Sequence, residues 1–248
     1  MRQVWLTEDE CLLDGVRFEV GKSNFSNLKT DANRIWVLKG KTFFDRYNSY
    51  FGDISPKNVL EIGVFEGGSA LLLADKWPDA RIVGIDIREP NPEVAAHVAR
   101  FGFGGRISLY YKTSQNDSVA VRDIVEREFP DGIDIVIDDA SHMYELTKAT
   151  FDIVFPYVIP GGLYLVEDWA WAHWRDWQAK EDWMGQPALS NLLFEVSMAC
   201  ASSRWIISDV YTNSNFFAVR KASECPPLSH PFHIANTYLL RGKTLAKI

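Results

Sequence analysis

From Asn58 onward, short runs of apolar residues alternate along the chain with amphipathic segments. The apolar runs are rich in β-branched residues and are bounded by Gly, Pro or Asp, which is typical of buried strands. They predict strands at Val59–Ile62, Arg81–Ile85, Ile107–Tyr110, Ile133–Ile137 and Gly162–Val166. The segments between them predict helices at Ser69–Trp77, Pro92–Ala99, Val119–Glu128 and Tyr144–Val154. Strands and helices that alternate in this way predict a doubly wound α/β fold around a parallel sheet.

The two ends of the chain follow other patterns. One helix is expected from Ile35 to Tyr50, and another near Leu189–Ala201. Two later strands, Trp205–Ser208 and Asn215–Val219, are joined by a short polar connection, which predicts an antiparallel hairpin. Five parallel strands and a terminal hairpin predict a seven-stranded Rossmann-like sheet of the kind found in methyltransferases. Dinucleotide-dependent dehydrogenases have six parallel strands instead.

The changes of pattern also give the expected domain boundaries. We expect a helical N-terminal extension at 1–57, the sheet domain at 58–220, and a surface tail with a short helix at 221–248. A tryptophan-rich lid is expected at 169–187. Its five tryptophans are Trp169, Trp171, Trp174, Trp177 and Trp183. An aromatic stripe of this kind lines an acceptor site or packs a subunit interface, so a homo-oligomer is also expected.

Composition narrows the class of protein further. Hydrophobic residues make up 47% of the 248 positions, which is enough for a large core. A net charge of -7 without a cluster of Lys and Arg argues against a nucleic-acid partner. No apolar run approaches the ~20 residues needed to span a bilayer, and the first residues lack the apolar core of a signal peptide. Three cysteines without a CxxC pair favour a reducing compartment. We therefore expect a cytoplasmic protein without a membrane partner.

A glycine-containing turn follows the first predicted strand of the sheet, in the sequence VLEIGVFEGGS. Phe65 stands where a dinucleotide-binding turn has its second glycine, and its side chain would crowd a pyrophosphate. The turn instead matches the E-x-G-x-x-x-G form common in methyltransferases. Asp86 ends the second strand, where an acid can bind both ribose hydroxyls. An ordinary turn and a helix cap would explain each feature singly. Together they predict S-adenosylmethionine as cofactor, with contacts from Glu61, Gly63, Glu66, Gly67, Ser69 and Asp86.

Polar residues also follow the third predicted strand. Gln115 and Asn116 occupy the position that meets the adenine of the cofactor in this kind of fold. The same stretch also suits the N-cap of a helix that starts near Ser118. Both interpretations stay open from the sequence.

Acidic residues follow the fourth and fifth strands. The fourth strand ends in Asp138 and Asp139, with His142 three residues later, and the fifth ends in Glu167 and Asp168. Because ligands bind at the carboxyl ends of parallel strands, we expect these side chains to converge. Carboxylates that lie close together need a cation or raised pKa values, and oxygen ligands favour Mg²⁺ over zinc.

The runs IDDASHMYELT and PYVIPGGLYLVEDW resemble the metal-dependent sugar O-methyltransferases of macrolide and related antibiotics, and the related cephalosporin-hydroxylase family. The likeness covers about residues 55–170. It implies that Asp139, Glu167 and Asp168 hold Mg²⁺, that His142 is the general base, and that Asp138 is a neighbour of the site or a cofactor contact. The segment after Asp168, WAWAHWRDW, differs from the polar acceptor loop of the sugar enzymes, so the acceptor stays open. His173 in that segment is a second candidate base.

These features predict an S-adenosylmethionine-dependent methyltransferase that uses Mg²⁺ to O-methylate a small hydroxylated natural product, either a sugar or an aromatic compound. One alternative within the same fold is a metal-independent N-methyltransferase acting on an aromatic amine. Another is a non-catalytic binding protein that keeps the sheet as a scaffold. An NAD-linked oxidoreductase is disfavoured by Phe65 and by the terminal hairpin.

Overall fold

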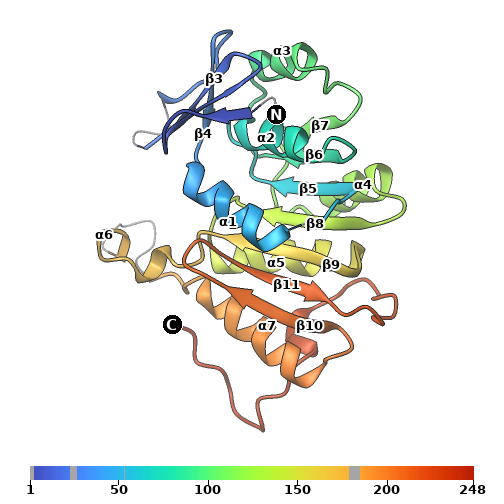
Figure 1. Cartoon of the computed structure of the whole chain (residues 1–248). Coiled ribbons are helices and arrows are strands. Elements are labelled where there is room, and N and C mark those ends of the chain that lie inside the picture. Colours follow the sequence, from blue (N-terminus) through green and yellow to red (C-terminus); the bar gives the residue numbers. More distant parts are fainter. Residues whose placement is uncertain (1–2, 23–26, 53, 179–184) are drawn as a thin grey trace. The chain divides into compact units, whose positions relative to one another are not determined.

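The computed structural model describes residues 3–22, 27–52, 54–178 and 185–248 (Figure 1). The chain divides into two compact units, residues 1–112 and 113–248. The strand order of the main sheet is β10-β11-β9-β8-β5-β6-β7, with β10 and β11 antiparallel to their neighbours. The predicted α/β class and the seven-stranded, mostly parallel sheet are confirmed. The boundary between the two units lies after residue 112, whereas the sequence analysis placed boundaries near residues 57 and 220.

The first unit contains three parallel strands of this sheet, β5 (Asn58–Ile62), β6 (Arg81–Ile85) and β7 (Ile107–Tyr110). They are connected by α2 (Gly68–Lys76) and α3 (Pro92–Arg100). The side chain of Asn91 caps α3 by accepting a hydrogen bond from the backbone of Glu93, and Pro92 occupies the first turn. All five elements lie within one residue of their predicted bounds, because near-continuous apolar runs mark buried strands clearly.

The first unit also contains a second, four-stranded sheet, which the sequence analysis did not predict. It consists of β1 (Gln3–Trp5), β2 (Glu10–Leu13), β3 (Val16–Val20) and β4 (Arg34–Val37), followed by α1 (Lys41–Phe51). The expected helix from Ile35 is therefore wrong over its first residues. In β4, Ile35 and Val37 are buried while their neighbours are partly exposed, the two-residue period of a strand, and β4 pairs in parallel with β3. The expected helical extension is mainly a β-sheet.

Within the first unit, hydrogen bonds and close packing connect this small sheet and the loop before β4 to α2 and α3. Glu66, which directly precedes the N-terminal end of α2, accepts hydrogen bonds from the backbone N–H of Thr30 and from the side-chain amide of Asn91, both at 2.8 Å. A Cβ atom on Gly68 would lie 2.4 Å from the backbone oxygen of Trp36, so β4 and α2 approach each other closely. Only glycine permits this packing.

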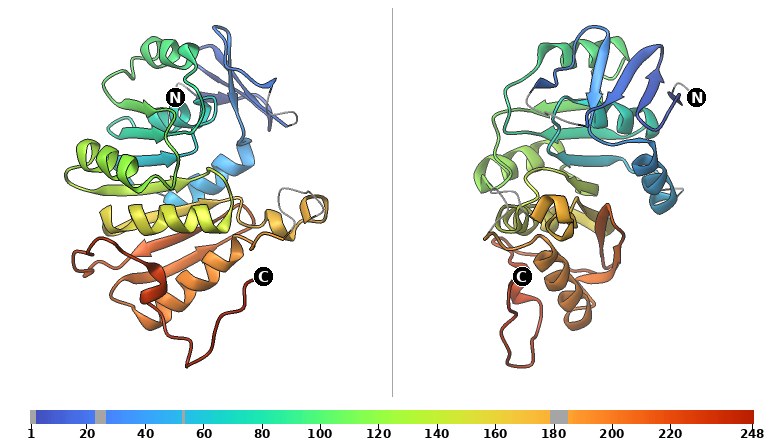
Figure 2. Two further views of the ribbon diagram at one scale, coloured as in Figure 1. Left: turned by 180° about the vertical axis from the view of Figure 1, so that it is seen from behind. Right: turned by 90° about the vertical axis from the view of Figure 1, so that its left-hand side faces the viewer.

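The second unit begins with α4 (Ser118–Glu128), β8 (Ile133–Asp138), α5 (Tyr144–Val154) and β9 (Val158–Glu167). Strand β9 pairs in parallel with β8 on one side and antiparallel with β11 (Phe216–Lys221) on the other. The predicted terminal hairpin is present as β10 (Ile207–Thr212) and β11, a few residues later than expected. Helix α5 packs between α4 and α7 (Ser190–Ser202), as Figure 2 shows from behind.

Short elements and a long tail complete the second unit. The short helices are η2 (Phe155–Tyr157), η3 (Trp171–His173), α6 (Arg175–Gln178) and η4 (Ile234–Asn236). The buried ammonium group of Lys221 donates hydrogen bonds to the backbone carbonyls of Pro156, at 2.9 Å, and Val158, at 2.7 Å. The tail contains one short helix among the described residues, η4, which lies before the end of the chain and not at it as expected. Instead, the carbonyl of Ile248 accepts hydrogen bonds from the backbone of Ala188 and the side chain of Asn191, both at 2.7 Å.

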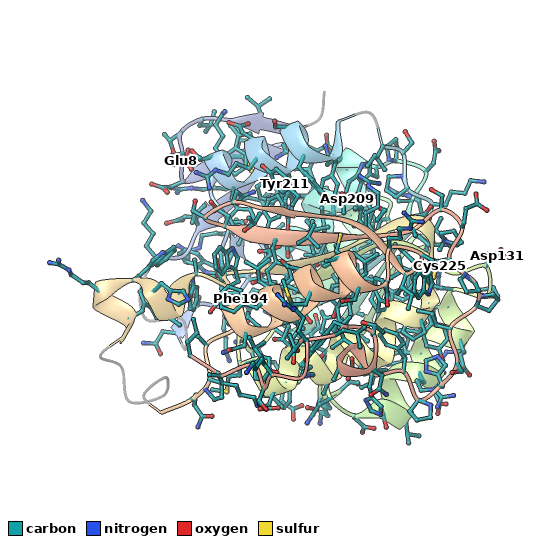
Figure 3. The ribbon with its side chains drawn as sticks, turned by 90° about the horizontal axis from the view of Figure 1, so that it is seen from below. Glu8, Asp131, Phe194, Asp209, Tyr211 and Cys225 are labelled. Atoms are coloured by element: carbon teal, nitrogen blue, oxygen red, sulfur yellow. The ribbon has the colours of Figure 1, made fainter. Side chains whose placement is uncertain are left out.

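The outer face of α7 and the loop after it expose large apolar side chains. Phe194, Met198 and Trp205 are 41%, 38% and 55% exposed, and Tyr211 on the neighbouring β10 is 42% exposed. Phe194 and Tyr211 are labelled in Figure 3. Strand β10 stands at the end of the strand order. The expected homo-oligomer stays a prediction. Among the described helices, none has the length and apolar character that a bilayer span requires.

Candidate active site

The turn after β5 is held in an unusual backbone conformation by Asp86. Gly63, Phe65 and Gly67 have φ angles of 90°, 51° and 80°, in the left-handed region. One carboxylate oxygen of Asp86 accepts hydrogen bonds from the backbone N–H groups of Val64, at 2.9 Å, and Phe65, at 2.7 Å. Because it fixes the turn, Asp86 has a structural role that the sequence analysis did not predict. Its binding to a ribose stays a prediction.

The other predicted cofactor residues of the first unit are buried near this turn. Glu66 is 4% exposed, and in addition to its bonds to Thr30 and Asn91 it forms an ion pair with Arg88 at 3.1 Å. Glu61 is fully buried and lies 4.0 Å from the ammonium group of Lys39. Gly67 and Ser69 are buried at the start of α2. These contacts fix the shape of the turn. Binding of a cofactor by these residues stays a prediction.

Gln115 joins the loop after β8 to helix α5, within the second unit. Its side-chain N–H donates to the hydroxyl of Thr150 at 2.8 Å, and its side-chain oxygen accepts from the backbone N–H of Ser141 at 3.1 Å. Asn116 is exposed, and the adjacent Asp117 is the N-cap of α4, so the helix-cap interpretation of this stretch is confirmed. A role of Gln115 and Asn116 at the adenine stays a prediction.

Three of the predicted site residues come together after β8 and β9. The ligand atoms of Asp139, His142 and Asp168 all lie within 4.8 Å of one another, and Nε2 of His142 is 3.8 Å from a carboxylate oxygen of Asp139. We call these three residues the acid–histidine group. Within the described part of the chain, Glu167 is not a member of it. Glu167 is the last residue of β9, only 1% exposed and paired with Phe216 of β11, whereas Asp168 lies beyond the end of the strand.

Two members of the acid–histidine group have a backbone conformation that ordinary residues rarely adopt. His142 has a φ angle of 56° and Asp168 one of 52°. Such a conformation costs about 1 kcal/mol or more, and it persists only where other contacts enforce it. Here the backbone N–H of Asp168 donates to Asn215 at 2.7 Å, and the preceding Ser141 is held by Gln115. Strain of this kind is concentrated at functional sites.

Asp138 lies inside the protein, next to the acid–histidine group in sequence. It is 2% exposed, and its carboxylate accepts a hydrogen bond of 2.8 Å from the hydroxyl of Tyr164. Burial, together with the neighbouring charge of Asp139, raises the pKa of Asp138 to about 7. This supports its expected place as a neighbour of the site.

A small recess adjoins the acid–histidine group. It is partly open to solvent and is lined by His142, Asp168, Trp169, Trp171, Ala172 and residues 186–189. The rings of His142 and Trp171 lie 4.6 Å apart, and Trp177 stacks on Trp171 at 4.2 Å. Part of the predicted tryptophan-rich lid therefore lines a pocket. Trp183 lies outside the described residues.

His173, the second candidate base, lies on η3 and is exposed. Its Nε2 is 2.9 Å from the hydroxyl of Ser190, the first residue of α7. His173 therefore fastens the tryptophan segment to α7, and it is not a member of the acid–histidine group.

With this geometry established, comparison with known proteins identifies the central part of the chain. Residues 60–169 match the family described as "Methyltransferase domain". This segment is a methyltransferase domain. Over 149 residues, the chain is 34% identical to the mycinamicin VI 2''-O-methyltransferase of Micromonospora griseorubida, a match that covers 56% of this chain and 34% of that protein. The resemblance inferred from the sequence is confirmed.

Other relatives carry names of the same kind. The chain is 30% identical over 154 residues to an 8-demethyl-8-α-L-rhamnosyl tetracenomycin-C 2'-O-methyltransferase of Streptomyces olivaceus, covering 57% of this chain and 36% of that protein. The matched segment thus spans about a third of the length of these curated relatives. Among solved structures, MycE methyltransferase of the mycinamycin pathway, in complex with Mg, SAH and mycinamycin VI, has a TM-score of 0.58 and 29% identity. That likeness covers 73% of this chain and 49% of MycE.

Proposed function

We propose that this chain is an S-adenosylmethionine-dependent O-methyltransferase, assisted by Mg²⁺, that acts on a small hydroxylated natural product. The observation on which the proposal rests is the acid–histidine group, which follows the parallel strands β8 and β9 within a methyltransferase domain. The relatives of that domain carry names of sugar O-methyltransferases. In open α/β sheets, ligands bind at this end of the strands.

Two observations support S-adenosylmethionine as the cofactor. The turn after β5 has a phenylalanine where a pyrophosphate would need glycine, and Asp86 stands at the end of the next strand. The solved MycE structures are complexes with SAH and Mg. The residues predicted to contact the cofactor are Gln115, Asn116 and Asp138, together with six residues of the first unit: Glu61, Gly63, Glu66, Gly67, Ser69 and Asp86.

The donor atoms of the acid–histidine group suit a hard divalent cation. The ligand atoms of Asp139, His142 and Asp168 lie within 4.8 Å of one another, so the two carboxylates would be placed to hold Mg²⁺ together. A nearby cation also offsets the repulsion between the carboxylates of Asp139 and Asp168. We assign these two residues as ligands, and Glu167 would have to move to join them. When bound, Mg²⁺ would lower the pKa of a hydroxyl that contacts it.

We assign His142 as the general base that removes the proton of the acceptor hydroxyl. Its Nε2 is 3.8 Å from a carboxylate oxygen of Asp139, a negative charge that stabilises the imidazolium once the proton has arrived. His142 lines the recess, so its ring would face an acceptor hydroxyl bound there.

Binding measurements test this proposal without knowledge of the acceptor. We expect calorimetry to detect S-adenosylmethionine binding, and the paramagnetic resonance spectrum of Mn²⁺ to show bound metal. Asp168→Asn should lose Mn²⁺ binding and keep cofactor binding. Asp209→Asn, which changes an exposed acid on β10, is the matched control and should keep both. A protein that fails to bind S-adenosylmethionine would contradict the enzyme assignment and favour a binding protein.

A turnover assay separates the proposal from its main alternative. Release of S-adenosylhomocysteine should stop after chelator treatment and return on addition of Mg²⁺. His142→Ala should lower kcat by about 10²-fold or more if His142 is the base. Turnover that is indifferent to the chelator would instead support the metal-independent N-methyltransferase.

A further inference from the structure

The recess beside the acid–histidine group is nearly closed in this structure. Next to His142 and Asp168 it has room for about one water molecule. The ring of Trp171, on the tryptophan wall of the recess, lies 4.6 Å from the ring of His142. Sites that hold small molecules are typically much larger. An acceptor can therefore reach His142 only after one of the walls of the recess has moved.

One wall, formed by residues 186–189, is bonded to Ile248. The backbone N–H of Ala188 donates to the carbonyl of Ile248 at 2.7 Å. The buried side chain of Asn191, in the first turn of α7, donates to the carbonyls of both Ala188 and Ile248 at 2.7 Å. It also accepts a hydrogen bond of 3.1 Å from the backbone N–H of Ile248. Asn191 thus clamps Ile248 onto this wall.

The neighbouring Lys247 contacts the helix that begins just after His142. Its ammonium group donates to the carboxylate of Glu145 at 2.5 Å and lies 4.6 Å from the centre of the Tyr144 ring. Tyr144 is the first residue of α5, two positions after His142. Two adjacent residues of the tail therefore connect the segment next to His142 with wall 186–189, and both of these segments line the recess or adjoin it.

Residues 241–248, which we call the strap, are nearly all exposed. In Figure 1 the strap bends away from α7 and returns to the start of that helix. The chain before the strap is better anchored, because the hydroxyl of Tyr238 donates to the buried carboxylate of Glu195 at 3.0 Å. The backbone N–H of Ile234 likewise donates to Asp152 at 2.8 Å. Since segments with few buried contacts open at a low free energy, the strap can detach while its base stays in place.

We propose that the strap controls the entry of the acceptor. While Lys247 and Ile248 are bound, the recess stays closed, and when they detach, wall 186–189 can move and an acceptor can reach His142. The inference rests on the proposed function, which places the acceptor hydroxyl in this recess. An exposed ion pair and a few hydrogen bonds are weak enough to break and form again with every substrate.

Access to His142 can be measured with diethyl pyrocarbonate, a reagent larger than water that acylates the imidazole ring of histidine. Peptide mass spectrometry reads the acylation rate of each histidine, and the experiment needs no metal, cofactor or acceptor. The side chain of His142 is 13% exposed, so we expect it to react slowly in the unaltered protein. His233, with a side chain that is 56% exposed at the anchored base of the strap, is the internal reference.

Substitutions in the strap and its clamp should change this rate. Lys247→Glu should accelerate the acylation of His142 about two- to fivefold, because it places a like charge opposite Glu145, and adding Glu145→Lys should restore the slow rate. Asn191→Asp should accelerate it about tenfold, because a carboxylate cannot donate to the two carbonyls. Lys243→Glu is the matched control. It makes the same charge change in the strap, where the side chain of Lys243 is exposed, and should leave the rate unchanged.

Hydrogen exchange at the backbone N–H of Ala188 reports the release of the strap itself, because this N–H donates to Ile248. Exchange at Ala188 should accelerate in Lys247→Glu and in Asn191→Asp, in parallel with the acylation of His142. If exchange accelerates and acylation does not, the strap detaches without opening the recess and the inference is wrong.

Other results would also overturn the inference. It is wrong if neither rate changes in Asn191→Asp, or if Lys243→Glu acts as strongly as Lys247→Glu. It is wrong as well if His233 accelerates together with His142, because the whole second unit has then loosened. Binding of S-adenosylmethionine and Mn²⁺ by the unaltered protein tests the proposed function separately. Absence of both would contradict that function, and with it the role of the strap in acceptor entry, even where the acylation rates respond.

Discussion

Replacing Gln115 by methionine tests whether this side chain holds the protein together or reads the adenine of a cofactor. The buried amide makes two hydrogen bonds, to the hydroxyl of Thr150 and from the backbone of Ser141. Methionine has nearly the same length and volume, so the Gln115→Met variant loses the bonds without opening a cavity. Each bond contributes about 1 kcal/mol, so we expect the free energy of unfolding to fall by about 2 kcal/mol.

That loss is large enough to measure by thermal unfolding. For a chain of this size, 1 kcal/mol shifts Tm by about 2–4 °C, so Gln115→Met should lower Tm by about 4–8 °C. Because Ser141 lies between Asp139 and His142, a looser loop should also weaken Mn²⁺ binding severalfold. Asn116→Ala is the matched control: Asn116 is exposed, and its substitution should change stability by less than about 0.5 kcal/mol.

The opposite pattern of results would refute this reasoning. If Gln115 mainly contacts adenine, Gln115→Met should weaken the binding of S-adenosylmethionine and leave Tm within about 1 °C of the unaltered protein. Calorimetry with the cofactor and thermal unfolding of the same preparation distinguish the two roles.

Three further substitutions or modifications test other parts of the fold. Gly68→Ala forces a Cβ atom to within 2.4 Å of the Trp36 backbone oxygen, so Tm should fall by several degrees, whereas Gly104→Ala, in open space, should not lower it. Lys221→Met leaves the backbone carbonyls of Pro156 and Val158 without this donor and should lower the free energy of unfolding by about 2–3 kcal/mol in urea titration. Burial raises the pKa of Cys11 to about 12, so mass spectrometry should find Cys11 unmodified by a thiol reagent until urea unfolds the protein.

The strands and helices of the main sheet could be predicted because their apolar runs follow simple periods. The N-terminal sheet was missed although a local indication was present. Asp14 and Gly15, between β2 and β3, have φ angles of 48° and 79°, as in the two-residue turn of a hairpin, and Asp-Gly between alternating residues indicates such a turn. The helix expected from Ile35 also ran across Gly40, the extended N-cap residue that precedes α1. Only the second part of the expected helix is helical in the structure, as α1. The prediction wrongly extended this helix back over the residues of β4.

The candidate site could be predicted only in part, for a similar reason. Acids at the ends of β8 and β9 were expected to converge, because the strand ends themselves were predictable. Which of the adjacent Glu167 and Asp168 joins the group depends on the backbone conformation of Asp168, and the periodicity of the sequence does not encode it. The partner of Gln115 lies 35 positions away on α5, so its structural role depends on packing that only the fold defines.

The left-handed backbone at His142 and Asp168 affects how this protein can change in evolution or in the laboratory. At these two codons, selection acts on the shape of the main chain as well as on the reaction. In a saturation library, asparagine and glycine should preserve expression while abolishing turnover, whereas valine and isoleucine should fail before any reaction can be measured. New acceptors are therefore easier to reach by varying the tryptophan walls than by redesigning the group that performs the chemistry.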